Sequence, residues 1–135
     1  MRRETQRTDE RKMNAQKIKW LRIAYWTAAI ADFVVAILVL IPSRMGVTNY
    51  VYPMGLMSAV AFSWGVLLIF ADRHPLERRW ILLPTAVVVA LLGVVGFHAG
   101  FTKIIPLVRI IPSTIVTILV LLILIYSYIN SRDYR

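Results

Sequence analysis

The chain has 135 residues, a formal net charge of +9 at pH 7 and no cysteine, and 59% of its residues are hydrophobic. An ordinary soluble domain is about 45–50% apolar, so this chain holds more apolar side chain than a water-soluble core can bury. The lack of cysteine excludes disulfides, thiol redox chemistry and cysteine-ligated metals. The basic residues stand in the gaps between apolar runs, which favours membrane flanks over nucleic-acid binding.

In chain order, the sequence predicts a basic tail and then four membrane-spanning helices. The tail, residues 1–19, carries seven basic and three acidic side chains. Each of the four apolar runs has the length of about 20 residues that a helix needs to cross the bilayer. Because the connectors are short, neighbouring helices should run antiparallel, and we expect an all-α, up-down four-helix membrane bundle. The predicted spans are residues 20–41, 51–71, 80–101 and 104–129, followed by a short C-terminal end at 130–135.

The distribution of basic residues predicts the orientation of this bundle. Eight lie in the tail and at Arg22, three in the second connector and two at the C-terminal end, which makes thirteen on one side. Only Arg44 and Lys103 fall on the other side. Lys and Arg accumulate in cytoplasmic loops, so we expect both termini in the cytoplasm of a multi-pass protein of the cell (inner or plasma) membrane. The cytoplasmic arginines should face anionic lipid headgroups.

Asp32 is the residue with the clearest chemical potential, because it lies near the middle of the first predicted span. A charged group there costs about 2.5–3.5 kcal/mol on insertion scales, so the carboxyl is either protonated or faces a partner or water. Arg109 is the one basic residue well inside a span, and helices one and four should be neighbours. Ser113 and Thr117 follow Arg109 at four-residue steps and complete a candidate intramembrane polar site.

Three interpretations of Asp32 and Arg109 remain open from the sequence. The pair could lock two helices together, or it could form a functional pocket or a proton-linked site. Alternatively the two residues do not meet, and Arg109 extends its side chain toward the interface.

Small residues on the third span predict close helix packing. Such residues let helices approach each other, inside one chain or in a dimer. The predicted packing face comprises Ala86, Ala90, Gly93, Gly96 and Gly100.

No catalytic, cofactor or metal set can be assembled. His74 and His98 fall on opposite sides of the membrane, so they cannot share one metal or haem. No carboxylate–histidine or nucleophile–base set falls on one side either. We therefore expect a protein without catalytic activity, cofactor or metal.

The stretch ADRHPLERRW, with SWGVLLIF before it, resembles small bacterial four-span membrane proteins of the BphX-like kind. That resemblance implies architecture but no defined activity. The chain is also similar to the small multidrug resistance family, which has four spans and one essential carboxylate in the first, a place that Asp32 could fill. That carboxylate is a glutamate there, Arg109 would compete with cationic substrates, and the strong charge bias does not suit a dimer of two orientations.

The leading functional hypothesis is a non-enzymatic accessory or lipid-associated subunit, with a membrane protein partner or a second copy as its companion. A small-molecule or proton-linked transporter that uses Asp32 and Arg109 is the alternative.

Overall fold

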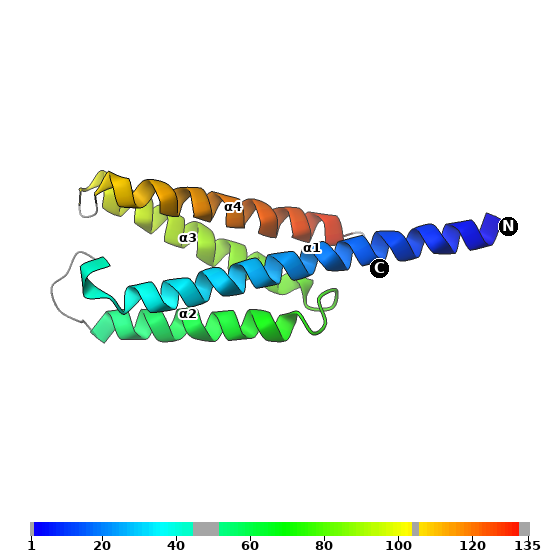
Figure 1. Cartoon of the computed structure of the whole chain (residues 1–135), viewed down its shortest axis with the longest axis horizontal. Helices are drawn as coiled ribbons and strands as arrows, with labels where there is room; N and C mark the ends of the chain where they lie inside the picture. The colour runs from blue at the N-terminus through cyan, green and yellow to red at the C-terminus, as the bar shows by residue number, and fades with distance from the viewer. Residues whose placement is uncertain (1, 45–51, 104–105, 133–135) are drawn as a thin grey trace.

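The computed structural model describes residues 2–44, 52–103 and 106–132, and it leaves the side chains of residues 2–9, 52, 107 and 109 undescribed. These ranges form four long α-helices and two short 3-10 turns (Figure 1). Neighbouring helices run antiparallel, as an up-down bundle requires. The helices are α1 (Arg2–Val39), α2 (Tyr52–Ala71), α3 (Leu82–Phe101) and α4 (Leu107–Ser131), and the turns are η1 (Pro42–Arg44) and η2 (Arg79–Ile81).

Prolines mark most of the helix boundaries. Pro42 follows the end of α1, and a proline disfavours helical geometry in the residue before it. Pro53 and Pro84 lie in the first turns of α2 and α3, where a missing N–H costs nothing. Pro106 precedes α4 with an extended backbone (φ −63°, ψ 137°). Pro112 lies inside α4 and removes the hydrogen bond that the Val108 carbonyl would otherwise accept.

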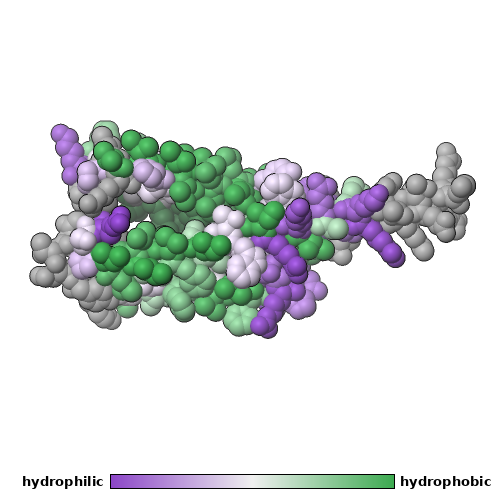
Figure 2. Space-filling view, in the orientation of Figure 1, coloured by the Kyte–Doolittle hydropathy of each residue, from purple (hydrophilic) through white to green (hydrophobic). Residues whose placement is uncertain are grey.

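All four helices are long and apolar enough to cross a membrane. The segments that meet this criterion are Glu10–Val39, Pro53–Ala71, Arg79–Phe101 and Ile110–Ser131. Large apolar side chains such as Val60, Val94 and Leu122 are more than half exposed in the isolated chain. Figure 2 shows an apolar band over the bundle, with charged residues gathered beyond one end. This is the surface of a small four-span membrane protein, because lipid covers such a band.

The first helix is longer than a membrane span. It begins at Arg2 and has 38 residues, and Figure 1 shows its N-terminal part projecting past the rest of the bundle. The sequence explains this continuity, because the first 41 residues contain neither proline nor glycine and many are strong helix formers. The boundary predicted at residue 19 therefore marks a change of polarity within one continuous helix.

The helices pack as two pairs, α1 with α2 and α3 with α4, which are joined mainly by a contact between α1 and α4. Helices α2 and α3 lie further apart. The core lies toward the end that carries the α2–α3 connector, residues 72–81. Its fully buried members include Leu21, Tyr25, Leu68, Leu82 and Leu124.

Candidate functional site

Asp32 lies on the buried face of α1. This face repeats every four residues and also carries Ala24, Ala28 and Ala36, all of them buried. The Asp32 side chain is 7% exposed, and its Oδ2 atom has no hydrogen-bond partner among the described residues. Most buried polar atoms are paired, so an unpaired carboxylate oxygen at membrane depth marks a candidate functional group.

The register between α1 and α4 places Asp32 beyond the shared core. Ser127 Oγ donates a hydrogen bond to the Trp20 carbonyl at 2.9 Å, which fixes the level of the two helices. Asp32 lies about 18 Å further along α1, level with residue 115 of α4. The described residues of α4 from 111 to 119 are exposed or half-buried, and burial on that helix resumes at Val120. The carboxyl therefore lies level with a stretch of α4 in which no described residue is fully buried.

Beyond this level the two helix pairs diverge. Figure 1 shows α1 with α2 separating from α3 with α4 toward the end at which α1 stops, and Figure 2 shows the surface hollowed between them. Each pair stays closed within itself. Ser58 Oγ donates to the Ala36 carbonyl at 2.7 Å between α2 and α1, and Phe33 lies edge-on to Phe62 with their ring centroids 5.2 Å apart. By the register given above, Asp32 thus lies at the level where the two pairs begin to diverge.

The other residues of the predicted polar site do not join Asp32 through hydrogen bonds. Ser113 Oγ donates to the Ile110 carbonyl at 2.9 Å, and Thr117 Oγ1 donates to the Ser113 carbonyl at 2.9 Å, so both hydroxyls serve their own helix. The side chain of Arg109 lies outside the described residues. Its backbone is six residues, or about 9 Å, beyond the level of Asp32, so the pairing of Asp32 with Arg109 stays a prediction.

The small residues of α3 face α4 at two of the predicted positions. A Cβ atom added to Gly93 would lie 2.9 Å from Thr117 Cγ2, and one added to Gly100 would collide with Ile110 Cδ1. No described atom lies within 4 Å of a Cβ added to Gly96, so among the described residues this glycine makes no close helix contact. Ala86 packs against the core cluster and Ala90 is half-buried.

Asp72, which the sequence patterns did not single out, ties the α2–α3 connector to α1. Its Oδ2 accepts a hydrogen bond from Trp26 Nε1 at 3.2 Å, and its Oδ1 lies 3.6 Å from Arg22 Nε. The contact between Oδ1 and Arg22 is an ion pair without a hydrogen bond, because Oδ1 has no hydrogen-bond partner among the described residues. The position of this acid, directly after the last residue of α2 and among the arginines of the connector, is the signal that could have revealed the contact.

Further polar contacts close the same end of the bundle. Tyr25 Oη donates to the Pro75 carbonyl at 3.3 Å, and Arg79 Nη1 donates to the Ser131 carbonyl. The connector is thus bonded to both α1 and α4 at this end of the bundle.

Comparison with known proteins supplies no relative, because no family, curated protein or solved structure matches the chain. Within the described residues, no group of three or more His, Asp or Glu side chains is placed to hold a metal ion.

Proposed function

We propose that this four-span protein is a non-enzymatic accessory subunit, oriented with both termini in the cytoplasm, whose basic helical arm docks an acidic partner. The arm is defined as residues 2–19, the part of α1 that projects beyond the bundle. The observation that carries the proposal is the helical continuity of this charged segment with the first span.

The charge of the arm is suited to an acidic surface. The arm has seven basic and three acidic residues, and among its described side chains Arg11, Lys12 and Lys19 are exposed. Complementary charge speeds the encounter of two proteins and suppresses wrong partners. An arm of fixed direction also loses little conformational freedom when it binds.

The geometry of the arm favours a protein partner over lipid. A straight helix that continues a span leads away from the bilayer, and 18 residues extend about 27 Å. Charges are screened beyond about 8 Å at physiological ionic strength, so headgroups attract only the part of the arm nearest the membrane. The remaining charge is available to the cytoplasmic surface of another protein.

Co-purification in mild detergent tests this function. The reversal variant combines Arg11→Glu, Lys12→Glu, Lys17→Glu and Lys19→Glu, and it leaves nine basic residues on the predicted cytoplasmic side. We expect the parent to retain a stoichiometric partner that the reversal variant loses. The matched control keeps every charge, with Arg11→Lys, Lys12→Arg, Lys17→Arg and Lys19→Arg, and should retain it. A partner that survives the reversal, or no stoichiometric partner at all, would contradict the docking role.

The orientation is tested separately, because the chain contains no cysteine. Ser43→Cys and Glu77→Cys place single thiols at exposed positions on opposite ends of the bundle. In intact cells, an impermeant thiol reagent should label the first and spare the second. The reverse pattern would place the termini outside.

A second candidate function rests on Asp32, the buried carboxyl at the level where the two helix pairs diverge. In a proton-linked transporter such a group would bind and release a proton during each cycle. In proteoliposomes with an imposed pH gradient and an enclosed pH dye, the parent would then conduct protons and Asp32→Asn would not. Asp72→Asn, at the closed end, is the control and should behave like the parent. Equal flux through Asp32→Asn would exclude this role.

A further inference from the structure

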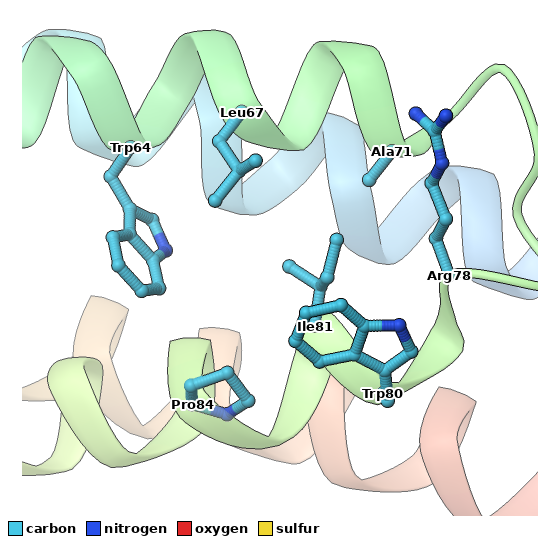
Figure 3. A pocket seen from close by; sticks show the side chains of 7 residues that line it. All are labelled: Trp64, Leu67, Ala71, Arg78, Trp80, Ile81 and Pro84. Atoms are coloured by element: carbon cyan, nitrogen blue, oxygen red, sulfur yellow. The ribbon is translucent and has the colours of Figure 1, made fainter.

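A groove between α2 and α3 lies on the outer face of the bundle, near the α2–α3 connector. Its volume is about 560 Å³, within the range of roughly 300–1,000 Å³ that ligand sites occupy. Trp64, Leu67 and Ala71 line it from α2, at successive turns (Figure 3). Ile81 and Pro84 line the opposite wall.

The interior of the groove suits a hydrocarbon chain. Trp64 Nε1 donates to Thr85 Oγ1 at 3.1 Å, and Thr85 Oγ1 donates to the Ile81 carbonyl at 2.8 Å. These two bonds satisfy the polar groups of the inner wall, so the wall offers no unpaired donor or acceptor to a polar ligand. The surrounding side chains Leu67, Trp80 and Leu83 are exposed apolar groups of membrane spans, so the groove opens sideways toward lipid.

The connector end of the groove carries a positive charge. Arg78 and Trp80 lie at this end, and Figure 3 shows the Arg78 guanidinium beside Ala71, at the last turn of α2. Arg78 Nη1 donates to the Phe70 carbonyl at 2.7 Å, which holds the side chain in place. A guanidinium has five N–H donors, so others remain for a phosphate.

The nearby carboxylates do not cancel this charge. Asp72 is bonded to Trp26 and paired with Arg22, both on α1. Glu77 is 81% exposed and lies 4.0 Å from His74. Neither is among the groove residues.

We infer that this groove binds one anionic phospholipid, with an acyl chain between Trp64 and Pro84 and its phosphate on Arg78. A tryptophan at the membrane interface suits the level between chain and headgroup, which is where Trp80 lies. A smaller groove between α3 and α4 serves as an internal contrast. It measures about 260 Å³, is lined by residues such as Phe97, Phe101 and Ile111, and has no charged side chain among the described residues that line it. These described residues offer no charge that would distinguish one headgroup from another.

The test is native mass spectrometry of the full-length chain in mild detergent, titrated with phosphatidylglycerol or with phosphatidylcholine of the same acyl chains. We expect phosphatidylglycerol to bind about tenfold more tightly, because the choline cation of phosphatidylcholine partly neutralises the phosphate that Arg78 binds, whereas phosphatidylglycerol keeps its net negative charge. Arg78→Gln should remove this preference by weakening the binding of phosphatidylglycerol more than that of phosphatidylcholine.

Two further variants keep the inference open to refutation. Arg73→Gln removes the same charge from the same connector, but Arg73 stacks on Phe70 at 4.9 Å outside the groove, so the preference should persist. Leu67→Trp fills the groove and leaves the Arg78 bond to Phe70 intact, so both lipids should bind more weakly. Far-UV circular dichroism checks that each variant folds. If Arg78→Gln does not fold, lipid binding by Leu67→Trp tests whether the lipid occupies the groove.

Several results would overturn the inference. Equal binding of the two lipids would do so, as would an equal loss from Arg73→Gln and Arg78→Gln, which would indicate general surface charge. Unchanged lipid binding by Leu67→Trp would place the lipid elsewhere. A parent dimer that Leu67→Trp converts to a monomer would assign the groove to a second copy of the chain.

Discussion

The two ends of the bundle are built differently. At the connector end, the four helices share a core around Leu21, Leu68 and Leu124, and polar bonds tie residues 72–81 to α1 and α4. At the other end, α1 holds to α2 and α3 holds to α4, but the two pairs diverge. Asp32 lies at the boundary between these regions. One end therefore supplies the stability of the fold, and the other is free to carry a site.

The surrounding lipid explains how the bundle can be packed at one end and open at the other. In water, a cleft lined by apolar side chains would close, because burying that surface is favourable. Within the bilayer, acyl chains are as apolar as leucine, so little drives the helix pairs together without specific packing or hydrogen bonds. The connector end has such contacts and the cleft end has few.

The largest expected effect concerns the predicted ion pair between Asp32 and Arg109. Such a pair would tie the two helix pairs together at the cleft end and so remove the contrast between the two ends. If Asp32 and Arg109 are bonded, Asp32→Ala and Arg109→Ala should each lower the free energy of unfolding in detergent by about 3–5 kcal/mol, because the remaining charge is left unpaired. The double variant Asp32→Leu with Arg109→Met should recover much of that loss. Single variants that melt like the parent would show that the residues do not pair.

A matched pair of leucines sharpens the comparison between core and lipid face. Leu68 is fully buried at the connector end and Leu91 is 60% exposed on α3. Leu68→Ala should lower the free energy of unfolding by about 2–5 kcal/mol, because it leaves a cavity. Leu91→Ala should cost about 1 kcal/mol or less, since lipid fills the space. Denaturant titration of both variants in the same detergent measures the two losses of unfolding free energy. Equal losses would show that the core is not confined to the connector end.

The sequence was sufficient to predict the four spans, but not the helical continuation of α1 into the basic tail or the spacing between the helices. Hydropathy and proline positions predicted four spans, and the ends of α2 and α3 lie within two residues of the predicted ends. The groove was not predicted, because it depends on how far α2 stands from α3, and no residue pattern along one helix determines that distance. Asp72 was missed for a similar reason: its contact with Trp26 joins residues that are 46 positions apart.

Two glycines of α3 provide a smaller and more local test of the cleft end. Gly93→Ala should lower the free energy of unfolding by about 1–3 kcal/mol, because its Cβ would press on Thr117, a stiff β-branched side chain. Gly96→Ala is the control: it meets open space and should be neutral or stabilising by up to about 1 kcal/mol. Thermal melting of the two variants side by side checks this. Equal costs would mean that α3 and α4 do not approach closely at Gly93.

The smallest expected effect concerns the hydrogen bond between Trp64 and Thr85, which joins α2 to α3 at the inner wall of the groove. Thr85→Val keeps the side-chain shape and removes the acceptor, and Trp64→Phe removes the donor. A double-mutant cycle of these changes should give a coupling of about 0.6 kcal/mol, the average for such bonds between membrane helices.

This coupling is small because the unfolded chain in a membrane also finds hydrogen-bond partners. The matched control is Ser113→Ala, which removes a hydroxyl at the cleft end that bonds only to its own helix. It should change the free energy of unfolding by about 0.5 kcal/mol or less, and it should show no coupling to Trp64→Phe. No measurable coupling between Trp64 and Thr85 would show that this hydrogen bond does not hold α2 to α3. The connector and the contacts of α1 would then hold the two helix pairs together without help from the groove wall.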